Sequence, residues 1–192
     1  MSLAGIAGLL LLPVLGGWNS AYAQEVEVPT EVQLKFLTRI LTYDRSIAGR
    51  VNSEGKIVVG VIYQEKFWAS LSQKNEILQL ANSGLEVNGS RIVFKMIPVT
   101  ENADPASLPS RKEVSIYFLT PLRGVSLSAI FQKCTQEKIL TFGAVPSYCS
   151  KGAAVSVELK GDSPGIVINL TASQNEGCDF SSQLLKVARV IP

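Results

Sequence analysis

Short apolar runs and amphipathic stretches alternate along most of this chain. The run Lys56–Tyr63 is continuous, apolar and rich in β-branched residues, which is typical of a strand covered on both faces. The runs Arg91–Val99, Glu113–Thr120 and Lys138–Val145 predict three more strands. Because helical stretches lie between the runs, we expect parallel crossover connections. The pattern therefore predicts a three-layer α/β sandwich with a mostly parallel sheet.

Three helices are predicted ahead of and between these strands. The first begins near Thr30, which together with Gln33 matches a capping box. The second lies within residues 65–84. Its inward positions are predicted to be Phe67, Leu71, Leu78 and Ala81. The third covers Pro121–Cys134 and leads into the fourth strand.

The pattern changes in the last forty residues. Residues 153–170 read as two strands joined by a Gly-Asp-Ser-Pro-Gly turn, which predicts an antiparallel hairpin at one edge of the sheet. Its first strand is expected to be the half-exposed edge strand, and its second strand is expected to lie inside the first. Asp179 then stands at the N-cap position of a terminal helix. The apolar stripe of that helix is Phe180, Leu184, Val187, Ala188 and Ile191. Such a one-sided stripe indicates a helix packed on the sheet, and binding of a partner is the alternative.

The first 23 residues are predicted to be a secretory signal peptide. An apolar run is followed by Ala21-Tyr22-Ala23, a small-x-small cleavage site. The run is shorter than the about 20 apolar residues that span a membrane comfortably. No Lys or Arg precedes Lys35, so an uncleaved anchor remains the alternative. Residues 24–192 are expected to form a single α/β domain.

The amino-acid composition argues against several classes of function. The sequence has no histidine, which removes the usual general base at neutral pH and most zinc and copper sites. It has no glycine-rich phosphate loop, and the Ser53–Lys56 match to an S-x-x-K motif falls in a turn rather than at a helix start. A net charge of +2 is too weak for a nucleic-acid binder. We therefore expect no enzyme activity, no cofactor, no metal and no nucleic-acid partner.

Three cysteines remain after export, and two of them are expected to pair in an oxidising compartment. Cys134 and Cys149 bracket the fourth strand, and about six residues at ~3.3 Å each exceed the ~7 Å that a disulfide allows between Cα atoms. Cys149 and Cys178 flank the hairpin and would meet at one edge of the sheet. We predict a Cys149–Cys178 disulfide with Cys134 free, and three free or intermolecularly paired thiols are the alternative.

Few polar residues stand out as candidates for binding a partner. Tyr43, Asp44 and Arg45 form a compact polar cluster at the end of the first helix, which is either a solvated helix end or a binding site. Asn169 ends a predicted buried strand, so its amide is expected to bond backbone groups there. With Asp179 and Phe180 at the start of the terminal helix, these six residues are the candidate partner-binding set.

Residues 152–191, "GAAVSVELKGDSPGIVINLTASQNEGCDFSSQLLKVARVI", carry a Gly, a hairpin, an Ile-Asn-Leu strand end and a Ser-x-Leu-Leu-x-x-Ala-x-Val/Ile segment in that order. With the opening "LTRILTYDRSI" and "GKIVVGVIY", the chain resembles the YfiR-like family of bacterial periplasmic proteins. The specific residues lie in the last quarter of the chain, whereas the layout agrees throughout. The best-studied members have two disulfide pairs, and three cysteines allow only one.

The resemblance implies a periplasmic, non-enzymatic regulatory protein. Such a protein binds the sensor part of an inner-membrane signalling enzyme, a diguanylate cyclase or a histidine kinase, and holds it inactive. Cyclic di-GMP synthesis and biofilm formation would be the output, and family members are often dimeric. The alternative is a periplasmic solute-binding module, whose strand ends would hold a small molecule. The resemblance transfers no list of binding residues.

Overall fold

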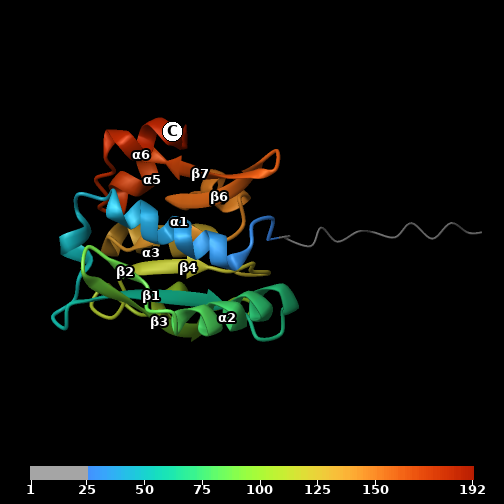
Figure 1. Cartoon of the computed structure of the whole chain (residues 1–192). Coiled ribbons are helices and arrows are strands. Elements are labelled where there is room, and N and C mark those ends of the chain that lie inside the picture. The colour runs from blue at the N-terminus through green and yellow to red at the C-terminus, as the bar shows by residue number, and fades with distance from the viewer. Residues whose placement is uncertain (1–25) are drawn as a thin grey trace, which may run out of the picture.

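The computed structural model describes residues 26–192, so the predicted signal peptide at residues 1–23 lies outside the described residues. The described residues form one mixed sheet of eight strands in the order β2-β3-β1-β4-β5-β6-β7-β8 (Figure 1). The strands are β1 Lys56–Tyr63, β2 Glu86–Val87, β3 Ser90–Pro98, β4 Ile116–Leu119, β5 Leu140–Gly143, β6 Val155–Lys160, β7 Ser163–Asn169 and β8 Arg189–Ile191.

The central strands β3, β1, β4, β5 and β6 are parallel. β7 runs antiparallel to β6, as the hairpin pattern predicts, and β2 is antiparallel to β3. The four apolar runs of the sequence all become strands. β1, β4 and β5 are buried along nearly their whole length, as β-branched residues without a polar alternation suggest, whereas β3 is only partly buried. β1 has the predicted bounds, whereas β4 and β5 are shorter than predicted.

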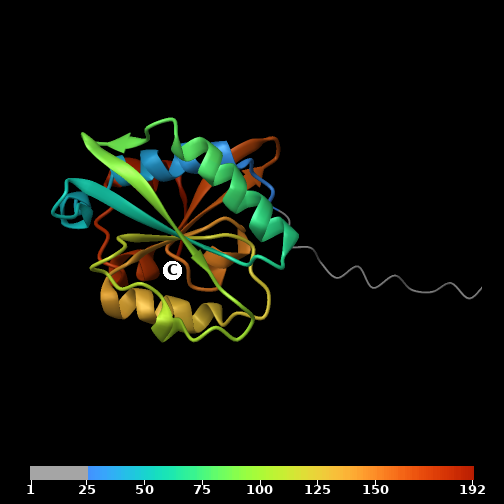
Figure 2. The same ribbon diagram turned by 90° about the horizontal axis from the view of Figure 1, so that it is seen from below.

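Helices cover both faces of the sheet, as Figure 2 shows with the sheet seen edge-on. The helices are α1 Thr30–Thr42, α2 Trp68–Ala81, α3 Leu127–Glu137, α4 Ser147–Ser150, α5 Leu170–Asn175 and α6 Ser182–Val187, with 3-10 turns at Ile47–Arg50 and Pro105–Ser107. One buried apolar cluster lies under α1, α2 and α6, and a second lies under α3 and α4. The predicted three-layer α/β sandwich is confirmed.

Two helices differ from their predicted form. The Thr30 hydroxyl makes no capping bond and instead donates to Glu76 Oε2 at 2.5 Å. In α2 the buried residues are Ser70, Gln73 and Ile77, whereas Leu78 of the predicted inward face is 43% exposed. The hydroxyl of Ser70 contacts Thr120 Oγ1 at 2.5 Å and accepts from the backbone N–H of Gln64 at 2.8 Å, which turns that polar face inward.

The third helix starts later than predicted, at Leu127 instead of Pro121. Gly124 has φ +63°, a left-handed conformation that interrupts a helix, and the Ser126 hydroxyl then accepts from the backbone N–H of Ala129 as an N-cap. The helix ends where Lys138 adopts the left-handed conformation.

The chain end also departs from the predicted helix. α6 is only six residues long, its N-cap is Ser181 rather than Asp179, and residues 189–191 form β8 parallel to β7. Pairing with β7 supplies backbone hydrogen bonds that β7 would otherwise lack along its outer edge, which favours a strand over one more helical turn. The hairpin therefore lies one strand inside the edge of the sheet. The predicted order within the hairpin is also wrong, because β6 pairs with β5 and lies inside β7.

The predicted Cys149–Cys178 disulfide is absent, because Cys134, Cys149 and Cys178 are all free and buried. Cys149 Sγ lies 3.6 Å from the carbonyl of Val167, whereas Cys178 Sγ accepts a hydrogen bond from Arg50 Nη2 at 3.0 Å. The two thiols thus have different neighbours, because α5 carries the chain away from the end of β7 before it reaches Cys178. This finding corrects the predicted pairing.

Candidate functional site

A buried ion pair connects the first helix to the rest of the molecule. Asp44, just after α1, and Arg50, at the end of the following 3-10 turn, are 2% and 3% exposed, and Arg50 Nε donates to Asp44 Oδ2 at 3.2 Å. The rest of the guanidinium donates to the carbonyls of Ser115, Lys138 and Glu176 and to Cys178 Sγ. All five N–H groups of Arg50 therefore have acceptors within the chain.

Asp44 also holds the C-terminal segment. Its Oδ1 accepts from the backbone N–H of Asp179 at 2.9 Å, and its backbone forms an isolated antiparallel bridge with Phe180. The backbone N–H of Arg45 donates to the carbonyl of Asp179, and that of Ser181 donates to the carbonyl of Tyr43. We call Asp44, Arg50, Cys178 and the neighbouring Glu176 the Arg50 joint.

Five of the six candidate partner-binding residues thus come together from opposite ends of the described chain. Asn169 stands apart: its Oδ1 caps α5 by accepting from Ala172 N, and its Nδ2 donates to the carbonyl of Cys149, as the sequence predicted for a strand-end amide. The prediction of a solvated helix end is wrong for Asp44, which is buried. It fits only Arg45 and Asp179, which form an exposed ion pair at 3.6 Å. The contacts of the Arg50 joint connect the segment after α1 to the C-terminal segment and thereby stabilise the fold.

Glu176 is a buried carboxyl that sequence reasoning missed. It is 1% exposed and accepts from Thr141 N at 2.7 Å and from Thr141 Oγ1 at 2.8 Å. Burial raises the pKa of Glu176 to about 8, although these hydrogen bonds and the charge of Arg50 act in the opposite direction. Nothing in the segment around Glu176 sets it apart from the surface carboxylates of the chain, so no signal in the sequence could have found it.

The carboxyl ends of the parallel strands form a pocket of about 570 Å³. It is lined by Gln64, Glu65, Lys66, Phe67, Pro98, Val99, Thr100, Glu101 and Arg123. The side-chain amide of Gln64, just after β1, donates to the carbonyl of Arg123 at 2.8 Å and accepts from its backbone N–H at 2.7 Å. This bidentate bond fixes the loop after β4 beside the end of β1. We call this the carboxyl-edge pocket.

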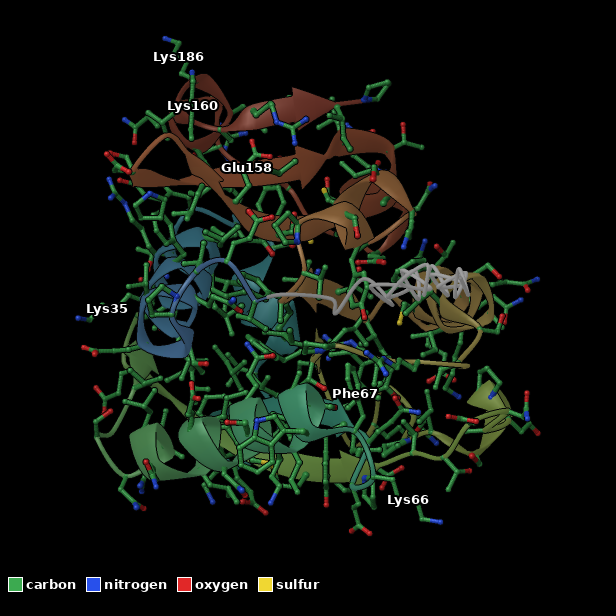
Figure 3. The ribbon with its side chains drawn as sticks, turned by 90° about the vertical axis from the view of Figure 1, so that its right-hand side faces the viewer. Lys35, Lys66, Phe67, Glu158, Lys160 and Lys186 are labelled. Carbon is green, nitrogen blue, oxygen red and sulfur yellow. The ribbon has the colours of Figure 1, made fainter. Side chains whose placement is uncertain are left out.

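One aromatic side chain, Phe67, lines the carboxyl-edge pocket, and a second, Trp68, follows it in the chain. The guanidinium of Arg123 stacks over the ring of Phe67 with 4.1 Å to the ring centre, a cation–π contact. Figure 3 shows Phe67 and Lys66 at this end of the molecule, with Lys66 pointing outward. The next residue, Trp68, is 77% exposed at the start of α2. A tryptophan this exposed leaves a large apolar surface in contact with water.

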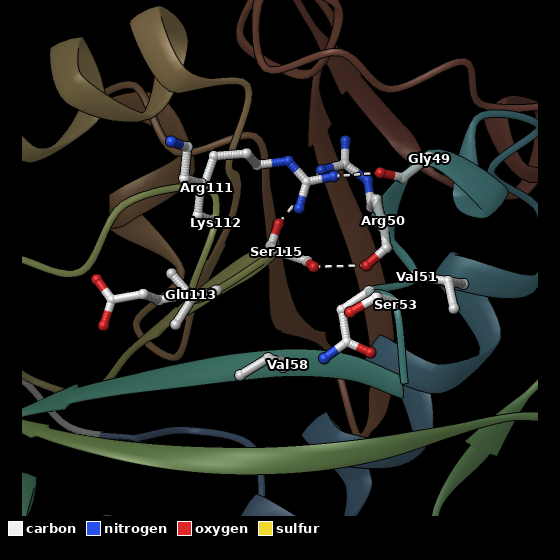
Figure 4. Close-up of a pocket in the computed structure, with 11 residues that line it drawn as sticks. Gly49, Arg50, Val51, Ser53, Val58, Arg111, Lys112, Glu113 and Ser115 are labelled. Atoms are coloured by element: carbon white, nitrogen blue, oxygen red, sulfur yellow. Dashed lines mark hydrogen bonds between the residues drawn. The ribbon is translucent and has the colours of Figure 1, made fainter. Parts of the chain in front are cut away.

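A second pocket, of about 360 Å³, lies at the amino ends of β1 and β4 (Figure 4). Basic and small polar residues dominate its lining, which is Gly49, Arg50, Val51, Asn52, Ser53, Val58, Arg111, Lys112, Glu113, Val114 and Ser115. It adjoins the Arg50 joint through Arg50 and Ser115. We call it the amino-edge pocket.

Within residues 26–192, no three His, Cys, Asp or Glu side chains gather in a way that could hold a metal ion. Over the same residues, no helix is both long and apolar enough to cross a membrane.

The family model described as YfiR/HmsC-like matches residues 30–189, which is more than half of the chain. The chain belongs to the YfiR/HmsC-like family. The family is one of periplasmic regulatory proteins, and the whole of the described sheet except the last strand's end falls inside the match. The resemblance seen in the sequence is thereby confirmed.

Solved structures share the fold at low identity. A conserved domain protein of Vibrio cholerae O1 biovar El Tor has 18% identity and a TM-score of 0.57, over 84% of this chain and 60% of that one. CD0873 of Clostridium difficile, a substrate-binding protein with adhesive properties, has 16% identity and a TM-score of 0.55, over 85% and 60%. An ABC domain from Streptococcus pneumoniae in complex with L-Trp has 13% identity and a TM-score of 0.54, over 79% and 62%.

This chain therefore spans about three fifths of the length of each of these solved proteins. No curated protein matches the sequence.

Proposed function

We propose that this chain is a periplasmic, non-enzymatic regulatory protein that binds an inner-membrane signalling enzyme and represses it. The partner would be a diguanylate cyclase, so that the protein lowers cyclic di-GMP and biofilm formation; a histidine kinase is the other partner of this type. Family membership over residues 30–189 supports the regulatory role. In the same proposal, residues 1–23 direct export and residues 24–192 act as one domain.

The observation that carries the proposal is the exposed Trp68 beside the carboxyl-edge pocket. Trp68 is 77% exposed, and it stands next to the stacked pair of Phe67 and Arg123. Trp and Arg are the side chains that most often dominate the energy of a protein–protein interface, especially around a pocket that a partner residue can fill. The bond between Gln64 and the Arg123 backbone holds this surface in one shape before a partner arrives.

The test compares cyclic di-GMP in the parent strain, a deletion strain, and deletion strains that express the wild type, Trp68→Ala or Leu78→Ala. Leu78 is a matched control, because it is an exposed apolar residue at 43% near the far end of α2. We expect deletion to raise cyclic di-GMP, the wild type and Leu78→Ala to restore it, and Trp68→Ala to fail while its periplasmic level stays normal. An unchanged level on deletion would contradict the cyclase as partner.

A solute-binding module is the second candidate, favoured by the same pocket. Its place at the carboxyl ends of β1 and β4 is where the chain connections leave toward opposite sides, the usual ligand position in open α/β sheets. The similar folds include a protein titled as substrate-binding. A ligand that raises the melting temperature of the wild type but not of Phe67→Ala, together with unchanged cyclic di-GMP on deletion, would favour this function over the first.

A further inference from the structure

The amino-edge pocket holds two arginines whose surroundings differ. Arg50 is buried, and all of its donors are used by acceptors of the Arg50 joint and by the carbonyls of Ser115 and Lys138. Arg111 is half-buried, and one of its N–H groups donates to the carbonyl of Gly49 at 2.5 Å. Figure 4 shows the Arg111 side chain extending toward Gly49 and Arg50 across the top of the pocket. The guanidinium of Arg111 therefore faces a pocket with most of its five donors still available.

Arg111 has no carboxylate partner among the described residues: none lies within 4 Å of its guanidinium. Glu113, two residues on, pairs with Lys95 at 2.7 Å and points away from Arg111 in Figure 4. Glu137 accepts from the backbone N–H of Arg111, and its other oxygen pairs with Lys133. The two nearby carboxylates are thus engaged by lysines.

The charge of Arg111 is consequently uncompensated. Burial, and then the positive charge of Arg50, lower the pKa of Arg111 from its ordinary value. A half-buried cation next to a second buried cation is unfavourable, and an anion in the pocket would offset both the repulsion and the partial loss of water.

Other polar groups at the pocket suit an anion. The Asn52 side-chain oxygen accepts from the backbone N–H groups of Glu54 and Lys56, which leaves its NH2 group as a donor. Lys112 and Ser53 are exposed members of the lining. The pocket volume of about 360 Å³ has room for a phosphate or carboxylate group carried on a small molecule.

We propose that the amino-edge pocket is a binding site for a small oxyanion, a phosphate or carboxylate group, whose main ligand is the forked guanidinium of Arg111. A planar guanidinium matches both groups in a bidentate way. The site is separate from the carboxyl-edge pocket, and it adjoins the joint that holds the C-terminal segment. Occupancy would therefore stabilise the folded chain, and the proposal does not depend on the partner proposed above.

The experiment titrates inorganic phosphate and, separately, citrate into the purified chain by isothermal titration calorimetry at constant ionic strength, with chloride as the reference anion. The variants are Arg111→Gln, Arg111→Lys and, as a matched control, Arg39→Gln, an exposed arginine on α1. We expect binding of at least one probe by the wild type. Arg111→Gln should weaken it by about tenfold or more, Arg111→Lys should weaken it less, and Arg39→Gln should leave it unchanged.

The anionic group could belong to a free solute or to a lipid headgroup, and a vesicle arm separates the two. Binding to phosphatidylglycerol vesicles but not to phosphatidylcholine vesicles, lost in Arg111→Gln, would assign the site to a headgroup, and binding of phosphate or citrate would assign it to a free solute. No binding in any arm, or equal weakening by Arg111→Gln and Arg39→Gln, would overturn the proposal. If Arg111→Gln does not fold, a wild-type melting temperature that phosphate and citrate leave unchanged relative to chloride overturns it as well.

Discussion

Replacing Arg50 by methionine tests whether the Arg50 joint holds the two ends of the described chain together. Methionine retains an unbranched apolar stem but removes every donor. The loss leaves Asp44 Oδ2 without its cation and deprives the carbonyls of Lys138 and Glu176 of their Arg50 bonds. Asp44 keeps three hydrogen bonds at Oδ1, from Ser46 N, Ser46 Oγ and Asp179 N, so the aspartate is only partly orphaned.

The expected loss follows from the burial of both partners. Removing one member of a buried ion pair costs about 3–5 kcal/mol, because the remaining charge stays away from water. Both side chains here are at most 3% exposed, so solvent screening gives no discount. For a chain of this size about 2–4 °C of melting temperature corresponds to 1 kcal/mol, and Arg50→Met should therefore melt about 6–20 °C lower.

The assay is urea unfolding followed by far-UV circular dichroism, since Trp68 is already exposed in the folded chain and its fluorescence would report little. A double-mutant cycle with Asp44→Asn separates the pair from the other bonds of Arg50, and a coupling of about 1–3 kcal/mol is expected. The control is Arg45→Ala, which removes an exposed ion pair and should cost no more than about 1 kcal/mol. A loss below about 1 kcal/mol for Arg50→Met, or strict additivity in the cycle, would refute the reasoning.

Three further predictions follow. The folded pKa of Glu176, about 8, lies above its ordinary value of 4.5, so the folded chain keeps a proton that the unfolded chain loses between those pH values. The free energy of unfolding should therefore fall as pH rises through this window, by at most about 1.4 kcal/mol per pH unit, and urea titrations of Glu176→Gln should show a shallower slope. Gly143→Ala should lose about 1–3 kcal/mol in the same assay, because its Cβ would lie 2.7 Å from Tyr148 Cβ, whereas Gly165→Ala meets nothing within 4 Å and should cost far less. Titration with a thiol reagent should find almost no reactive thiol in the folded chain and three per chain in urea, because all three cysteines are buried and unpaired; one thiol in urea would instead indicate a disulfide.

The centre of the sheet was predictable because β1 and β4 are continuous runs of apolar residues. Lys56–Tyr63 is a strand with the predicted bounds, and the hairpin lies where its turn signal placed it. The inward face of α2 was not predictable from apolar spacing, because Ser70 and Gln73 are buried by hydrogen bonds to distant partners. The last residues have helical spacing, yet three of them pair with β7, since an open strand edge is a tertiary feature that no local pattern records.

The candidate site was even less predictable from the local sequence pattern than the fold. The sequence drew attention to Asp44 as part of a compact polar cluster but gave no sign of Arg50, which lies in a turn-rich stretch. Arg50 bonds Ser115, Glu176 and Cys178, at separations of 65, 126 and 128 residues, and two of these three acceptors are backbone carbonyls. A residue of any type can supply a backbone carbonyl, so the spacing of residue types along the sequence could not reveal these acceptors.

The two edges of the sheet have different consequences for binding. At the amino edge, Arg50 is saturated by the fold, so Arg111 and the exposed Lys112 are the cations with donors left for a ligand. At the carboxyl edge, the hydroxyls of Ser70 and Thr120 bond each other and the backbone, and the side-chain amide of Gln64 holds the backbone of Arg123. Beside this pocket, Trp68 is exposed, and the exposed Arg123 stacks on the partly buried Phe67, so aromatic contact should contribute strongly to the affinity for a partner there. Apolar contact of this kind favours a partner protein over a small polar solute, which is the physical reason for placing the regulatory function first.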